Sequence, residues 1–273
     1  DVLYEDVPPL YESALSLMAK HDWKQALELL ERSADEKTAV SKSNFRTSAV
    51  YKNYVPHKKF LCYLGLGQED KAIEIANKIM GNAKAHSRVQ VMLGVLPIFV
   101  KQQDGKKALS VANELKDIRL PRKNLVDVRI NHCLALSLTK KYSEAKKGLS
   151  ALIDEFGEDY AGLGDRVAAA ETTILVYHEK NYTKAIRYFE DSLKEDREKA
   201  TADTYSKLAF CYGKKNKWEE SRWNYLQAYL VGSFSSADLK ELISKIEMTN
   251  SKINSEKGNV ALESFFGKVK KAL

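Results

Sequence analysis

The strongest constraint on the fold of this chain is a spacing pattern that occurs six times along it. Each copy is centred on a small residue, here called the anchor, with a large apolar residue nine positions before it and a further apolar residue four positions after it. The anchors lie 36 to 46 residues apart and are Ala26, Ala72, Ala108, Ala145, Ala185 and Ser221. A recurrence of this length indicates a repeat protein, in which each repeat completes its core against its neighbours.

Apolar residues within each repeat recur at spacings of three and four on both sides of a short polar break. This arrangement predicts a hairpin of two antiparallel helices. A small anchor is expected where the two helices cross closely, and an aromatic residue three positions earlier fills the gap beside it. That aromatic position holds Trp23, Tyr142, Tyr182 and Trp218, whereas the second and third repeats have Glu69 and Gly105 there. The chain contains only five prolines and 13 glycines, which also favours helices.

This pattern resembles the tetratricopeptide repeat, whose unit is a helix, a turn and a second helix. The resemblance covers roughly residues 7–233 and implies an all-α fold, a right-handed superhelix (α-solenoid) of about six helical hairpins. The repeats are divergent, because every interval exceeds the family's length of about 34 residues. The glycine that the family often places in the first helix is also replaced, by Ala14, Phe60, Leu96, Cys133, Thr173 and Ala209.

The predicted domain organisation has three parts. Residues 1–233 form the repeat array, and residues 234–250 form a capping helix that begins at Ser235 or Ser236. Its apolar stripe is Leu239, Leu242, Ile243 and Ile246. Residues 251–273 form a polar link and a C-terminal amphipathic helix. We interpret the insertion from Asp35 to Lys52 as an elongated first helix of the second repeat, bent or broken before Pro56.

The C-terminal amphipathic helix has three alternative roles. Its apolar stripe is Leu262, Phe265, Phe266, Val269 and Leu273. It could pack on the last repeat, occupy the groove of another copy of the chain and so promote self-association, or engage a partner. We do not expect it to contact a membrane, because it is short.

Residues that carry catalysis or bind metals do not occur in recognisable arrangements. The five histidines lack paired spacing, and the adjacent His132 and Cys133 point about 100° apart on a helix. No nucleophile elbow or Walker-type loop is present. The run Gly162-Leu163-Gly164 lacks the preceding strand that a phosphate loop needs. We therefore predict no catalytic residues, no cofactor, no metal and no enzyme activity.

The predicted function is that of a scaffold that binds a peptide or helix of another protein and helps to assemble a complex. In tetratricopeptide arrays the first helix of each repeat lines a concave groove, and the resemblance assigns Ala170 and Ile174 to it in the fifth repeat. The predicted groove residues are Leu61, Leu93, Ile130, Leu134, Ile174, Tyr177 and Phe210. The alternative is that these apolar residues only pack helices together. The family's lysine, asparagine and arginine clamp for a terminal carboxylate is not reproduced.

Excess positive charge is concentrated in the third and fourth repeats. Residues 101–147 contain twelve Lys and Arg against five Asp and Glu, a balance of +7 that equals the net charge of the chain. The predicted basic patch is Lys106, Lys107, Arg119, Arg122, Lys123, Arg129, Lys140 and Lys141. Such a patch attracts nucleic acid, acidic proteins or other polyanions, which is the alternative function, although a solvated face is a third interpretation.

The compartment is weakly constrained. Cys62, Cys133 and Cys211 are 71 and 78 residues apart, which matches neither a disulfide framework nor a zinc site. Three buried thiols favour a cytoplasmic location. The chain starts at Asp1 rather than methionine, so an exported or membrane-anchored parent protein with a longer N-terminus is the alternative.

Overall fold

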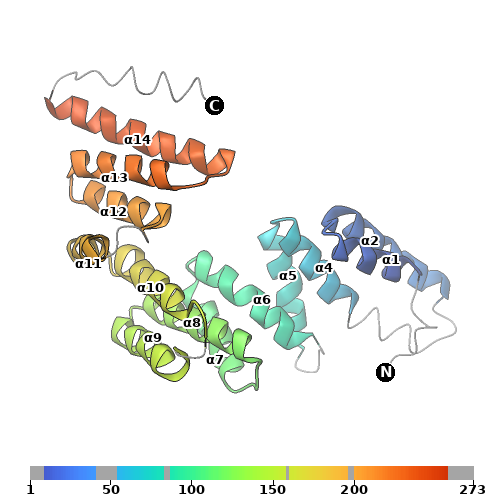
Figure 1. Cartoon of the computed structure of the whole chain (residues 1–273). Helices are drawn as coiled ribbons and strands as arrows, with labels where there is room; N and C mark the ends of the chain where they lie inside the picture. Colours follow the sequence, from blue (N-terminus) through green and yellow to red (C-terminus); the bar gives the residue numbers. More distant parts are fainter. Residues whose placement is uncertain (1–8, 41–53, 83–86, 158–159, 196–199, 258–273) are drawn as a thin grey trace. The chain divides into compact units, whose positions relative to one another are not determined.

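The computed structural model describes residues 9–40, 54–82, 87–157, 160–195 and 200–257. Within these residues the chain consists of helices joined by short turns, drawn in sequence order in Figure 1. The helices are α1 (Pro9–Ala19), α2 (Trp23–Val40), α4 (Val55–Gly65), α5 (Glu69–Met80), α6 (Arg88–Lys101), α7 (Gly105–Lys116), α8 (Arg122–Leu138), α9 (Tyr142–Phe156), α10 (Leu163–Thr173), the π-helical turn η2 (Ile174–His178), α11 (Tyr182–Glu195), α12 (Ala202–Lys214), α13 (Trp218–Val231) and α14 (Ser236–Lys257). The predicted all-α fold of helical hairpins is confirmed.

The six repeats correspond to six pairs of helices among the described residues. The pairs are α1 with α2, α4 with α5, α6 with α7, α8 with α9, α10 and η2 with α11, and α12 with α13. Every anchor lies in the second helix of its pair and is buried. Ser221 replaces alanine as an anchor without leaving a buried hydroxyl unpaired, because its hydroxyl donates a hydrogen bond to the Ala209 carbonyl at 2.8 Å.

Each pair of helices is joined by a turn of the same geometry. The residue five positions before each anchor has a left-handed backbone with φ between 55° and 68°, and these residues are His21, Gly67, Gln103, Lys140, Lys180 and Asn216. The backbone amide of the residue after it donates a hydrogen bond to a carbonyl in the last turn of the first helix. An example is the bond from the Asp104 amide to the Phe99 carbonyl at 2.9 Å. This is the Schellman way of ending a helix, and it fixes the direction in which the second helix starts.

In the first, second and fifth repeats, the residue three positions before the anchor contacts the first helix of the next repeat. The indole of Trp23 lies over Gly65 of α4, and the ring of Tyr182 meets that of Phe210 of α12 with centroids 6.1 Å apart. Glu69 makes an ion pair with Lys101 of α6 at 2.7 Å. The two departures from the aromatic pattern are thereby explained: an ion pair serves the second repeat, and in the third repeat another side chain fills the space beside Gly105.

That side chain is Leu138 of α8. A Cβ atom added to Gly105 would lie only 2.6 Å from the Leu138 Cβ. The gap between the third and fourth repeats is therefore filled from the opposite side.

The chain divides into two compact bodies, here called the N-terminal body (Asp1–Leu163) and the C-terminal body (Gly164–Leu273). In the N-terminal body, successive helices from α1 to α9 pack on one another, and α6 also contacts α8. In the C-terminal body, η2 packs on α11 and α11 packs on α12. Helix α12 in turn packs on α13, and α13 packs on α14. The handedness of the superhelix depends on how the repeats are stacked along the whole chain and stays a prediction.

Two segments differ from their sequence interpretation. Asp35 belongs to α2, so the first part of the insertion prolongs the second helix of the first repeat, whereas it was expected to form the first helix of the second repeat. Helix α14 continues to Lys257, beyond the predicted end at residue 250, because buried Ile253 extends its apolar stripe. The rest of the insertion from residue 41 and the predicted C-terminal amphipathic helix lie outside the described residues.

The start of α14 agrees with the predicted capping. The Ser235 hydroxyl accepts a hydrogen bond from the Asp238 amide at 3.2 Å and donates to the Asp238 carboxylate at 2.6 Å. Leu242 and Ile246 of the predicted stripe are buried against α13 and α12. Helix α14 therefore covers the apolar side of α13, as expected of a terminal cap.

Candidate functional site

The predicted groove residues of the N-terminal body are mostly engaged in helix packing. Leu61 of α4 and Leu93 of α6 are half-buried and contact the same hydrophobic core. Ile130 of α8 is 8% exposed, and Leu134 one turn later is half-buried. These side chains leave limited apolar surface for a ligand.

The C-terminal body presents a larger aromatic surface. Tyr177 of η2 is 42% exposed, and its ring packs on that of Phe210 of α12 at a centroid distance of 5.5 Å. The Lys214 ammonium lies 5.2 Å from the centre of the Phe210 ring, and Tyr182 of α11 contacts the same ring edge-on. Partial burial, followed by the nearby Asp203 and Cys211, raises the pKa of Tyr177, so its hydroxyl is protonated and can donate at neutral pH.

The π-helical turn explains the exposure of Tyr177. The Glu179 amide donates to the Ile174 carbonyl at 2.8 Å, and the Asn181 amide donates to Leu175 at 3.1 Å. The Asn181 amide bonds to the carbonyl six residues before it, whereas the equivalent amide of each other repeat bonds to the carbonyl five residues before it. The π-helical turn η2 therefore contains one extra residue. The extra residue lets Tyr177 lie on the surface while the residues before it stay in the core.

The same turn corrects the predicted groove position in the fifth repeat. Ile174 is 0% exposed, so it belongs to the core and takes no part in a surface groove. Once the extra residue is counted, Ile174 matches the buried residues Cys62, Ile98, Ala135 and Cys211 of other repeats. Thr173 and Ala169 then occupy the groove positions assigned to Ile174 and Ala170. Thr172 takes the place of Thr173 as the residue at the position of the family's first-helix glycine.

Polar groups extend the aromatic surface along α12. Asp203, Lys207, Phe210 and Lys214 follow one another at spacings of four, three and four residues, so they share one face of the helix. The Lys207 ammonium, in a residue that is 8% exposed, pairs with Asp203 at 2.6 Å and donates to the Thr172 hydroxyl of α10 at 3.5 Å. This contact connects α10 to α12.

Next to this contact lies a cleft of about 630 Å³, and Thr172 is part of its lining. Its walls are one side of α10 from Asp165 to Thr172, the second half of α11 and the first turn of α12. Ala168, Ala169 and Phe189 give the cleft apolar surface, and Asp165, Glu195 and Asp203 bring three carboxylates to it. The alanines create the space, because Ala169 takes the place held by His57, Leu93 and Ile130 in the second to fourth repeats.

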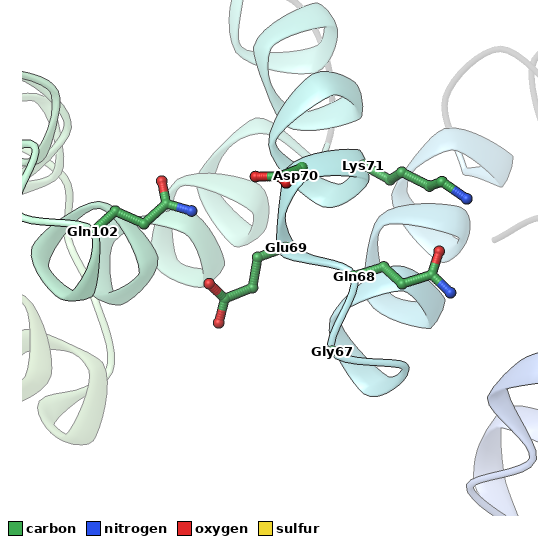
Figure 2. Close-up of a pocket in the computed structure, with 6 residues that line it drawn as sticks. All are labelled: Gly67, Gln68, Glu69, Asp70, Lys71 and Gln102. Atoms are coloured by element: carbon green, nitrogen blue, oxygen red, sulfur yellow. The ribbon is translucent and has the colours of Figure 1, made fainter.

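A second hollow, of about 520 Å³, lies beside the turns of the second and third repeats. It is lined by polar residues of the Gly67–Lys71 segment and by Gln102 (Figure 2). Figure 2 shows that Gln68 and Lys71 extend to one side, whereas Glu69 extends to the side on which Gln102 lies. These side chains do not converge on one point, so the hollow is a poor candidate for a ligand site.

The predicted basic residues lie at different places in the N-terminal body. Lys106, Lys107, Lys140 and Lys141 flank the turns within the third and fourth repeats, whereas Arg119, Arg122 and Lys123 lie at the other end of the same helices. Helix α7 separates the two groups by about 16 Å along its axis. The predicted patch is therefore two groups of residues, with Arg129 between them on α8.

Several of these cations already have partners. Lys107 pairs with Asp104 at 2.9 Å, Lys141 with Glu144 at 3.5 Å, and Arg129 with Glu155. The guanidinium groups of Arg122 and Arg129 also lie over the Phe156 ring, at 5.2 and 5.5 Å from its centre. These contacts give both arginines a structural role in holding α8 to α9.

The three cysteines are buried and have low reactivity. Burial raises the thiol pKa of Cys62 and Cys133 to about 11 and that of Cys211 to about 12. These thiols are protonated at neutral pH and react slowly. In the described parts of the chain, no group of three or more His, Cys, Asp or Glu residues is arranged to hold a metal ion. None of the helices in those parts combines the length and the apolar character needed to cross a bilayer.

Comparison with known proteins shows similarity in fold. No protein-family model matches the sequence, and no curated protein matches it. Among solved structures, a tetratricopeptide repeat protein from Parabacteroides merdae is similar over 87% of this chain and 97% of its own, with a TM-score of 0.52 and 16% identity. The tetratricopeptide repeat domain of P58(IPK) aligns over 92% of this chain and 66% of its own, with a TM-score of 0.38 and 13% identity. The chain has the fold of a tetratricopeptide repeat protein.

Proposed function

We propose that the chain is a non-catalytic interaction module that binds a peptide segment of another protein along the face between α10, η2 and α12. The observation that carries this proposal is the half-exposed Tyr177, held on Phe210 by the π-helical turn. Tyrosine and tryptophan are enriched among the side chains that contribute most to binding at protein interfaces. The first helices of stacked hairpins also provide an extended surface suited to a peptide.

The dimensions of this face fit a short segment. Asp203 and Phe210 are seven residues apart on α12, which corresponds to about 10 Å along the helix axis. An extended peptide covers that distance with about three residues. A partner segment with an apolar residue on Tyr177 and Phe210 would therefore reach the acidic cleft about three residues away.

The test uses peptides selected for binding. A phage-displayed library of random peptides is selected on the full chain, and the enriched peptides are synthesised with a fluorescent label and titrated by anisotropy. We expect Tyr177→Ser to weaken binding by about tenfold or more, the loss typical of an interface anchor. Trp223→Ser is the matched control, because Trp223 is 59% exposed on α13, outside the proposed face.

The result is decisive in either direction. The proposal is wrong if Tyr177→Ser and Trp223→Ser have equal effects, or if selection enriches no peptide at all. Leu134→Glu, tested beside Phe210→Glu, shows whether the first helices of the N-terminal body also contribute. Circular dichroism of each variant checks that a lost affinity does not come from unfolding.

Deletion of Tyr177 tests the role of the π-helical turn. The Asn181 amide already donates to the Leu175 carbonyl, and removal of one residue would give this bond the spacing found in the other repeats. We expect the shortened chain to fold with unchanged helical content but to lose peptide binding. A deletion variant that binds as well as the original chain would show that the turn has no part in recognition.

Polyanion binding is the second proposal, and it has less support. The basic residues form two groups, and Lys107, Arg129 and Lys141 are paired with acidic side chains. If it is correct, affinity for single-stranded or duplex nucleic acid falls steeply with salt concentration and is lost in the double variant Arg122→Glu, Lys123→Glu. Salt-independent binding would exclude it.

A further inference from the structure

We infer that the cleft between α10, α11 and the start of α12 receives a lysine or arginine side chain of the bound peptide, with its aliphatic stem against Ala169 and Tyr188 and its charge at Asp165 and Glu195. This inference rests on the proposed function, since it names the chemistry of the partner that the same face would select. It concerns an edge of the face that carries none of the predicted groove residues. The charge, the shape and the aromatic wall of the cleft support it.

The charge of the cleft is opposite to that of the chain. The chain has a net charge of +7, whereas the charged residues lining the cleft in the described part of the chain are three carboxylates. Asp203 is already paired with Lys207, which leaves Asp165 and Glu195 as the groups to be neutralised. Both are exposed. A cation entering from a partner is therefore favoured at this place, although the chain as a whole carries a net positive charge.

The interior of the cleft suits the stem of such a side chain. Ala168 and Ala169 are small, and Ala169 and Tyr188 expose apolar surface to the cleft, whereas Phe189 at its base is buried. Lysine and arginine cover apolar surface with their methylene groups while their charged ends stay near water. A volume of about 630 Å³ accommodates one such side chain together with part of the peptide backbone.

Tyr188 supplies an aromatic wall at the mouth of the cleft. It lines the cleft, is half-exposed, and its ring meets that of Phe189 edge-on with centroids 5.7 Å apart. Aromatic faces attract ammonium and guanidinium groups within about 6 Å. Carboxylates, an aromatic ring and an apolar floor together select a monocation on an aliphatic stem over a small inorganic cation.

The experiment compares peptide selection on two forms of the full chain. The first carries Asp165→Asn with Glu195→Gln, which removes both charges with little change in shape. The control carries Glu28→Gln with Asp154→Asn, which removes two exposed carboxylates from α2 and α9. We expect peptides selected on the unmodified chain to share a lysine or arginine about three residues from an apolar residue.

Titration of one such peptide completes the test. We expect its affinity to fall about tenfold on the cleft variant and to stay unchanged on the control, and replacement of its basic residue by glutamine to give the same loss. Enriched peptides that bind through Tyr177 but lack a preferred basic residue would overturn this inference and leave the proposed function standing. Enrichment of no peptide would overturn both.

Discussion

The contact between Trp23 and Gly65 allows the logic of the repeat to be tested by a double-mutant cycle. A Cβ atom on Gly65 would lie 2.6 Å from the Cγ atom of the Trp23 indole, far closer than van der Waals contact. Gly65→Ala is therefore expected to destabilise the chain by about 1–3 kcal/mol, as overpacking usually does. Trp23→Ala alone removes a half-buried ring and is expected to cost about 2 kcal/mol, less than full burial would imply.

The decisive quantity is the effect of Gly65→Ala when Trp23 is already alanine. The clash is then absent, and alanine is favoured over glycine in a helix by up to about 1 kcal/mol, so the sign of the effect should reverse. Urea unfolding followed by circular dichroism at 222 nm, a general helix signal, measures all four proteins. If Gly65→Ala is equally destabilising in both backgrounds, Trp23 does not pack on α4 and the assignment of the position three residues before the anchor is wrong.

Three further predictions concern stability. Gly67→Ala should cost about 1 kcal/mol in urea unfolding, because its Cβ would meet open space but φ is +68°. Phe189→Ala should cost about 3–5 kcal/mol, since Phe189 is 3% exposed, and a loss below about 1 kcal/mol would contradict the core assignment. Burial is the main cause that lowers the pKa of three half-buried histidines: His57, His132 and His178. As the pH falls through about 6.5, these histidines bind protons in the unfolded chain before they do so in the folded chain. The free energy of unfolding should therefore decrease between about pH 7 and pH 5. The decrease should be smaller in the variant with all three histidines replaced by glutamine.

The core of the fold was predictable because it depends on the sizes of residues at fixed spacing. All six anchors and the apolar residues four positions after them are buried, as their spacing predicted. A small residue at a helix crossing and an apolar one a turn later are properties of the side chains themselves, so the sequence shows them directly. The same is true of Ser235, whose hydroxyl caps α14.

The turns were harder to predict from their residues. The left-handed position holds Gly67 in the second repeat, but lysine, glutamine, histidine and asparagine elsewhere. Most of these residues do not signal a left-handed backbone. The regular spacing of five residues before the anchor is the available signal, and it becomes visible only when the six repeats are aligned on their anchors.

The candidate site was predicted in part. Tyr177 and Phe210 were named from the sequence and do lie in contact. Ile174 was misplaced by one position, because a single extra residue inside a helix changes which face each earlier residue occupies. The sequence contains a sign of the extra residue, because Thr172 and Thr173 are adjacent and either fits the position of the family's first-helix glycine. The cleft could not be foreseen, because it requires residues 35 positions apart, such as Thr172 and Lys207, to be brought together.

The irregular features of the fifth repeat concern one face of the C-terminal body. The π-helical turn places Tyr177 on the surface, and Ala168 and Ala169 open the cleft one helix length away. Neither feature improves packing: the first interrupts the hydrogen bonds of a helix, and the second leaves apolar contacts unmade. A repeat that served only to extend the array would be expected to keep its regular geometry. Departures from local regularity that share one surface are characteristic of functional sites, and in this chain they gather in the fifth repeat.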